Sequence, residues 1–246
     1  MPTKIKQSGI LSAFVLKIFA CVFMFVDHFG VAIFPQHEIF RIIGRLAFPI
    51  FAFFISEGCY YTKNRLKRFL SVAVLGVVCE TVYIIYDGQF YGNILLTFSL
   101  SILLIYLLDE IKKSIFSKRT DKTVLFSVLF LSLTVFAYIV KSHLDYGFFG
   151  ILTPVFLSFC DYKEGSHPQY FKYLFNKTTR LAVFAFALVL VSMQETAMNI
   201  QILALLSLIP LALYNGKIGR YKLKYAFYLF YPLHLLLIQG ISMLVK

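Results

Sequence analysis

Near its N-terminus the chain reads LSAFVLKIFACVFMFVDHFGVAIF over residues 11–34. This run is apolar apart from three ionisable residues, and as a helix it is long enough to cross about 30 Å of hydrocarbon. Similar runs recur along all 246 residues, of which 59% are hydrophobic, and the mean hydropathy is +0.78. A soluble globular domain is only about 45–50% apolar. The pattern therefore predicts a polytopic membrane protein.

The apolar runs predict about nine spans, within a range of eight to ten. Hydrocarbon offers the backbone no hydrogen-bond partners, so spans are helices or a closed barrel, and the lack of strict alternation favours helices. We expect an all-α bundle in a single membrane domain, residues 1–246, with the seventh span weakest because its apolar core is short. The spans cover approximately residues 11–34, 40–61, 69–86, 93–110, 123–140, 144–160, 178–194, 199–214 and 225–244.

The first run is interpreted as a retained span. It is too long for a secretory signal sequence, and no A-x-A-like cleavage site follows it. Most of the 24 Lys and Arg residues precede this span or follow every second span. Such residues accumulate on the cytoplasmic side. The sequence thus predicts a cytoplasmic N-terminus and an external C-terminus, and it assigns the net charge of +12 to membrane topology rather than to nucleic-acid binding.

The chain lacks the usual marks of a metal site or a soluble nucleotide-binding enzyme. Its four cysteines, Cys21, Cys59, Cys79 and Cys160, show neither C-x-x-C spacing nor histidines at zinc-site intervals. There is no glycine-rich phosphate loop and no G-x-S-x-G elbow. We expect reduced, structural cysteines and no metal.

Ionisable residues are concentrated in the early spans, where they are costly and by default functional. The predicted orientation divides them by depth. An inner layer contains Lys17 and Glu57, and an outer layer contains Asp27, His28, Arg41, Arg45, Glu80 and Asn93. The simpler interpretation is that these charges only neutralise one another and hold helices together. Six polar groups in one layer exceed that need and favour a functional cavity.

Helix geometry places several of these groups on shared faces. Lys17 and His28 are eleven residues apart and Arg41 and Arg45 four apart, so each pair lies on one face, which predicts a polar cleft. Asp27 and His28 point about 100° apart and cannot form a simple dyad. Asp27 would instead act through Arg45 or a backbone contact.

The last span holds a second histidine, His234, two residues after Pro232. Pro232 frees a backbone carbonyl and is expected to kink the helix. A histidine in a span often only bonds a neighbouring helix. His234 is therefore expected to line the cavity, and the choice between His28 and His234 as a base stays open.

Four segments carry a resemblance to a known family. They are K-x6-M-x2-DH from Lys17, RIIGRLAFPIFAFFISEGCYYTKNRLKR from Arg41, NILLTF from Asn93 and FYLFYPLHLLLI from Phe227. In these segments the chain resembles the TraX family of bacterial membrane proteins, whose name-giving member acetylates the N-terminus of F-type pilin. The FYPLH element is also similar to one in the acyltransferase-3 group. The resemblance implies a fold shared with heparan-α-glucosaminide N-acetyltransferase.

The resemblance implies acyl transfer from acetyl-CoA, or another acyl-CoA, to an amine or hydroxyl. His28 would be the general base, assisted by Asp27, with Arg45 or Asn93 stabilising the oxyanion. Basic residues just after Glu57, namely Lys63, Arg65, Lys67 and Arg68, would hold the CoA phosphates. The residues expected to bind the cofactor are Lys17, Arg41, Glu57, Lys63, Arg65, Arg68 and His234.

The expected location is the bacterial cytoplasmic membrane. The expected partners are acyl-CoA, the lipid bilayer and an unidentified acceptor (a protein N-terminus, a sugar or another amine or hydroxyl), with a homodimer as an open option. The alternative is a proton- or ion-coupled transporter. Against it, the charges cluster in the N-terminal spans, and no matched broken helices are evident. A non-catalytic assembly protein is a third option, and it would tolerate His28→Ala.

The topology predicts that a reporter fused after Lys246 is active outside the cytoplasm, because an odd number of spans separates it from a cytoplasmic N-terminus. Activity of that fusion in the cytoplasm would overturn the orientation.

Overall fold

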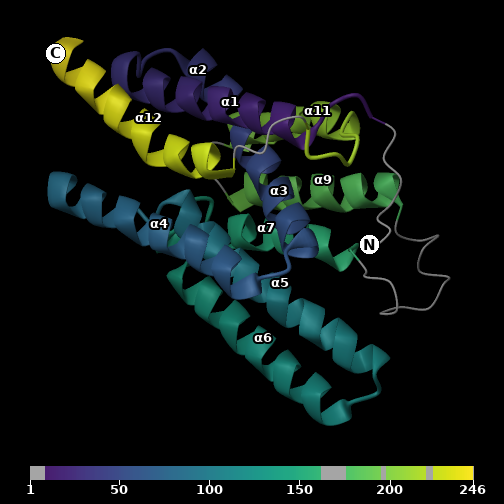
Figure 1. The fold of residues 1–246 in the computed structure, drawn as a ribbon. Coiled ribbons are helices and arrows are strands. Elements are labelled where there is room, and N and C mark those ends of the chain that lie inside the picture. The colour runs from purple at the N-terminus through teal and green to yellow at the C-terminus, as the bar shows by residue number, and fades with distance from the viewer. Residues whose placement is uncertain (1–8, 162–175, 195–197, 220–223, 246) are drawn as a thin grey trace. The chain divides into compact units, whose positions relative to one another are not determined.

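The structure, a computed structural model, describes residues 9–161, 176–194, 198–219 and 224–245. The elements named in this part of the chain are all helical (Figure 1). They are α1 (Ala13–Ile33), α2 (Glu38–Gly44), α3 (Ala47–Tyr61), α4 (Arg65–Asp87), α5 (Ile94–Phe116), α6 (Thr120–Val140), the 3-10 helix η1 (Lys141–His143), α7 (Gly147–Phe159), α9 (Lys177–Gln194), α10 (Met198–Gln201), the 3-10 helix η2 (Ile202–Ser207), α11 (Leu208–Ala212) and α12 (Lys224–Val245).

Seven helical segments in the described ranges are long and apolar enough to span a membrane. They correspond to expected spans one to five, seven and nine. The sixth and eighth correspond to the shorter apolar helices Gly147–Phe159 and Ile202–Ala212. Thirteen residues of α-helix extend only about 20 Å, less than the hydrocarbon thickness. The expectation that the seventh span is weakest was therefore wrong, because Lys177–Gln194 meets the length and hydropathy of a span.

The helices begin and end where local side chains satisfy the backbone. Ser12, Asn64 and Asn93 precede α1, α4 and α5, and each accepts a hydrogen bond from an amide of the first turn. Gly88 follows α4 with a φ of 70°, a left-handed conformation that glycine adopts without a steric penalty. These are ordinary sequence signals, and they place the loops at the ends of apolar runs.

The chain divides into two compact units, and the boundary falls inside α3. Unit 1 contains Ile55–Gln194, and unit 2 contains the described residues of Lys6–Phe54 and Glu195–Lys246. The single membrane domain expected from the sequence stays a prediction.

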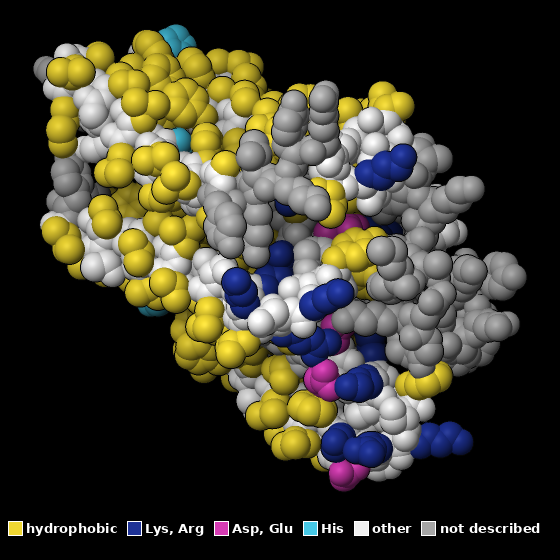
Figure 2. All heavy atoms as spheres, viewed as in Figure 1, with side chains coloured by type: hydrophobic (Ala, Val, Ile, Leu, Met, Phe, Trp, Pro, Cys, Tyr) yellow, Lys and Arg dark blue, Asp and Glu magenta, His cyan; other side chains and the backbone are white. Residues whose placement is uncertain are grey.

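In unit 1, α5 packs against α4, α6 and α7, and α7 packs against α9 (Figure 1). The residues of α6 are mostly exposed and apolar, including Val128, Leu131 and Phe136, as expected of a helix that faces lipid. Figure 2 shows Lys and Arg side chains gathered where α5 gives way to α6. This basic turn is one of the loops that the sequence assigns to the cytoplasmic side.

In unit 2, α1 packs against both α2 and α12. Two glycines permit the close approach of α1 and α2. A Cβ at Gly30 would lie 2.1 Å from Phe40 Cβ, and one at Gly44 would lie 2.3 Å from Asp27 Cβ. Small residues are the usual means of bringing membrane helices together. The contact matters because Asp27 is one of the expected site residues.

The second span is interrupted between α2 and α3, at Arg45 and Leu46. Pro49 explains the interruption, because its ring lacks an N–H and excludes the carbonyl of the residue four positions earlier, which is Arg45. The segment from α10 to α11 is also irregular, since six of its residues form the 3-10 helix η2. Such long 3-10 runs are uncommon and often mark a functional position.

The α1–α2 contact predicts that Gly30→Ala destabilises the protein, because the added methyl overlaps the Phe40 side chain. Overpacking of this kind costs about 1–3 kcal/mol. The matched control is Gly240→Ala on α12, where an added Cβ meets nothing within 4 Å. Thermal unfolding of the purified protein in detergent should show a lower midpoint for Gly30→Ala alone. Equal midpoints for the two variants would contradict this packing.

Candidate functional site

Unit 2 joins its two intramembrane histidines directly. His28 Nδ1, from α1, lies 2.8 Å from His234 Nε2, from α12. The rings are 12° from parallel with centroids 5.0 Å apart, so the two nitrogens face each other nearly in the ring planes. His234 is 3% exposed, and its Nδ1 lies 2.9 Å from the carbonyl oxygen of Phe230.

These contacts fix the proton positions when both rings are neutral. A carbonyl can only accept a hydrogen bond, so His234 Nδ1 carries a hydrogen and His234 Nε2 is an acceptor. His28 Nδ1 must then be the donor to His234. His28 Nε2 is left as a lone pair, with no hydrogen-bond partner in the part of the chain described. His28 is only partly buried. The arrangement assigns the basic atom to His28 and an orienting role to His234.

Asp27 is paired with Arg41. Arg41 Nη1 donates to both carboxylate oxygens of Asp27 at 3.1 Å. The backbone of Gly44 packs against the same carboxylate. The sequence predicted that Asp27 would act through Arg45 or a backbone contact, and the hydrogen-bonded partner proves to be the arginine one turn earlier. Arg45 still acts on Asp27 electrostatically.

Arg45 forms its hydrogen bond with a residue that the sequence analysis passed over. Arg45 Nη1 donates to Gln201 Oε1 over 2.9 Å. Gln201 is 1% exposed. The signal in the sequence was the amide of Gln201 at the start of the apolar run IQILALLSLIP, residues 200–210. Unit 2 thus pairs expected site residues with one another twice, His28 with His234 and Asp27 with Arg41, and it pairs Arg45 with Gln201, which was not expected.

Asn93 and Glu80 form a structural clamp in unit 1. The Asn93 amide donates to Glu80 Oε2 at 2.7 Å and to the Gly76 carbonyl at 2.9 Å, and its oxygen accepts from Leu95 N. Glu80 also accepts from the backbone amides of residues 91–93. Both Asn93 amide hydrogens are therefore used. The structure gives Asn93 the role of an N-cap rather than of a donor to an oxyanion.

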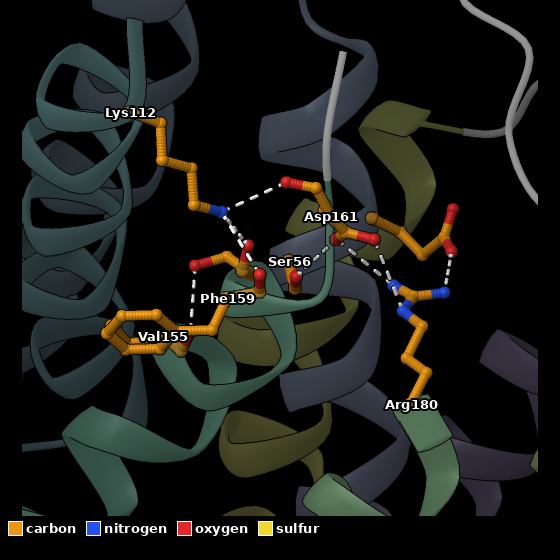
Figure 3. Close-up of polar contacts among 8 residues, drawn as sticks. Ser56, Lys112, Val155, Phe159, Asp161 and Arg180 are labelled. Atoms are coloured by element: carbon orange, nitrogen blue, oxygen red, sulfur yellow. Dashed lines mark hydrogen bonds and ion pairs between the residues drawn. The ribbon is translucent and has the colours of Figure 1, made fainter. Parts of the chain in front are cut away.

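Glu57 belongs to a buried ion cluster in unit 1 that the sequence analysis missed. Figure 3 shows three other members of this cluster, Arg180, Asp161 and Ser56. Arg180 Nη1 lies 2.7 Å from Glu57 Oε1, and Arg180 Nε lies 3.3 Å from Asp161 Oδ1. Ser56 donates to Asp161 over 3.2 Å. The side chain of Arg180 is 2% exposed. The sequence analysis did not single out Arg180, although an apolar run follows it immediately.

The basic residues expected to hold CoA phosphates are engaged to different degrees. Arg65 lies 2.6 Å from Glu110 and 2.9 Å from Asp109, so two carboxylates already compensate its charge. Arg68 donates to the Ile55 carbonyl at 3.2 Å. Lys63 is exposed. Phosphate binding by these residues stays a prediction.

Lys17 lies in unit 2, with Nζ 5.0 Å from the Phe54 ring centroid and 5.6 Å from that of Phe227. These are cation–π distances. Lys17 was expected to lie at the same membrane depth as Glu57. Because Glu57 belongs to unit 1, this expectation stays a prediction. No group of three metal-ligating residues occurs in the described ranges.

Comparison with known proteins supports the resemblance. The family described as "TraX protein" matches residues 12–242. The chain is 28% identical over 254 residues to "Probable fimbrial assembly protein FimC, serogroup H1" of Dichelobacter nodosus, which covers 96% of this chain and 97% of that protein. It is also 35% identical over 92 residues to "Uncharacterized protein RP591" of Rickettsia prowazekii (strain Madrid E). That match covers 37% of this chain and 35% of the length of that protein. No solved structure matches the chain significantly.

The buried cluster predicts that Arg180→Met destabilises unit 1, because it leaves the Glu57 and Asp161 carboxylates close together without their cation. Breaking a buried pair in this way costs about 3–5 kcal/mol. The control is Arg119→Met at an exposed position in the same unit. Thermal unfolding in detergent should separate the two variants clearly. An unchanged midpoint for Arg180→Met would show that the cluster contributes little.

Proposed function

The chain belongs to the TraX family, and we propose that it is a membrane-embedded acyltransferase that moves an acetyl or other acyl group from acyl-CoA to an amine or hydroxyl acceptor. The observation that carries this proposal is the chain of contacts from Phe230 O through His234 to His28, since it leaves one basic nitrogen on His28. The "fimbrial assembly" description of the Dichelobacter nodosus relative suits a protein acceptor at the cell surface.

The chemistry follows from that nitrogen. His28 Nε2 takes the proton of the acceptor amine or hydroxyl as the acceptor attacks the thioester carbonyl. The carbon–sulfur bond then breaks, and His28 Nε2 returns the proton to the CoA thiolate. No net proton is gained or lost by the protein. General-base assistance of this kind contributes roughly 10²–10⁴-fold to a rate.

His234 and the Asp27–Arg41 pair prepare His28 for this role. His234 Nε2 accepts from His28 Nδ1, and this hydrogen bond fixes the orientation and the tautomer of the His28 ring before a substrate arrives. Asp27 and Arg41 neutralise each other beside it, so that neither leaves an isolated charge in the span. With Asn93 committed to Glu80, Arg45 is the expected oxyanion donor that keeps a nitrogen, Nε, without a partner among the described residues.

One observation favours the alternative of an ion-coupled transporter. Unit 2 contains an interrupted second span and an irregular eighth segment, and broken helices often form ion and substrate sites in transporters. The sequence argument that such helices are lacking therefore loses force. Substrate-dependent proton flux in liposomes containing the purified protein would support transport. Label transfer from acetyl-CoA without such flux would support acyl transfer.

The proposal predicts that His28→Gln binds CoA as the wild type does but transfers acetyl groups roughly 10²–10⁴-fold more slowly, because it lacks the basic nitrogen. The control is His37→Gln, an exposed histidine of the same unit. Membrane vesicles from expressing cells would be supplied with acetyl-labelled acetyl-CoA, and both CoA release and label in other products would be measured. Undetectable CoA binding by the wild type would overturn the acyl-CoA assignment.

A further inference from the structure

Arg45 and Gln201 lie at two irregular stretches of backbone in unit 2. Arg45 immediately follows α2, where the second span is interrupted, and Gln201 ends α10, where the 3-10 helix η2 begins. Irregular backbone at membrane depth is tolerated only where protein buries it or where it borders a water-filled cavity. The hydrogen bond from Arg45 Nη1 to Gln201 Oε1 joins the two stretches.

The pair has more hydrogen-bond donors than acceptors. Gln201 Oε1 is the one acceptor atom of the two side chains, and Arg45 already occupies it. Arg45 Nε and Gln201 Nε2 are both buried and have no partner in the part of the chain described. An unpaired buried donor costs free energy, so native structures rarely keep one without a reason. What these two nitrogens lack is an acceptor oxygen.

The charges around the pair favour an anionic oxygen. Asp27 offers one negative charge to this region, and both of its oxygens accept from Arg41. Arg45 is thus a second cation near a carboxylate that is already paired, and Gln201 adds no charge. Hydrogen bonds from a guanidinium to an anion are stronger than those to a neutral acceptor.

We propose that Arg45 Nε and Gln201 Nε2 form a subsite that binds one anionic oxygen of a substrate. Two sources have this chemistry. One is a carboxylate or phosphate that a substrate carries, and the other is the oxyanion that forms from a thioester carbonyl. The second source rests on the proposed acyl transfer, whereas the first does not.

Gln201→Glu is the sharpest test. The new carboxylate would accept from Arg45 Nη1, as the amide oxygen does now, and would bring a negative charge, so it would pair with the arginine, remove the Nε2 donor and neutralise the site. The variant should therefore remain folded while losing the subsite. Gln201→Met repeats the test without adding a charge, and Gln36→Glu, at an exposed position in unit 2, is the matched control.

Two measurements on the full-length protein in detergent distinguish the sources. The first is the shift in thermal midpoint on adding inorganic phosphate or acetate at constant ionic strength. The second is acetyl transfer from acetyl-CoA, with acetyl-CoA binding measured alongside. We expect both Gln201 variants to lose at least about tenfold either in affinity for the added anion or in the rate of acetyl transfer. This is the loss expected when charge-assisted hydrogen bonds are removed.

A midpoint shift in the wild type and Gln36→Glu that is lost in the Gln201 variants identifies a substrate anion. The oxyanion is identified if the Gln201 variants bind acetyl-CoA normally but transfer acetyl groups at least about tenfold more slowly, and if added anions shift the thermal midpoint of none of the proteins. Equal anion shifts in all proteins, or no anion shift together with equal or absent transfer, overturn the subsite. If the wild type transfers no acetyl group, the anion shift alone decides, so the subsite and the enzymatic proposal fail separately.

Discussion

The hydrogen bond between His28 and His234 decides which nitrogen of each ring carries a hydrogen in unit 2. Within a membrane there is little water to exchange protons with buried groups, so the protein's own acceptors set each tautomer. The series of hydrogen bonds starts at the Phe230 carbonyl, which can only accept, so His234 Nδ1 must donate to it. His234 Nε2 is then an acceptor, and His28 Nδ1 must be the donor to it. Because the carbonyl belongs to helix backbone, the starting point is rigid. At the other end of this series, His28 Nε2 keeps a lone pair, and the His28 ring is partly buried.

The same constraint, that a polar group within hydrocarbon needs a partner, accounts for the other pairs. Arg41 neutralises Asp27, the Asn93 amide and three backbone amides satisfy Glu80, and Arg180 lies between two carboxylates. Each arrangement removes the main cost of placing an ionisable group at depth. Arg45 and Gln201 depart from it, since each keeps a buried donor without a partner among the residues described. These two donors are the observation on which the proposed subsite rests.

The sequence predicted the class of fold, and it identified ionisable residues inside apolar runs, but it did not predict their partners. Hydropathy over windows of span length located each helical segment, and the ionisable residues in those windows were identifiable by their cost alone. Partners depend on the rotation of each helix about its axis, which an apolar run does not determine. Arg41 and Arg45 share a face, so a choice between them as the partner of Asp27 required coordinates. Gln201 lies at the start of the 3-10 helix η2, and Arg180 lies in the first turn of α9. At both places the apolar periodicity of a helix is not evident in the sequence.

An acyltransferase and a transporter share many of these devices, because both must hold polar groups and irregular backbone within a membrane. Relay residues in transporters take up and release protons as the path alternates between the two sides. His28 differs in that its proton-accepting atom has no onward partner in the described part of the chain, while its other nitrogen is bonded to His234, whose remaining nitrogen ends at a carbonyl. A carbonyl cannot pass a proton on. The arrangement therefore suits a base that takes a proton from a bound substrate and returns it, and this favours transfer chemistry over conduction.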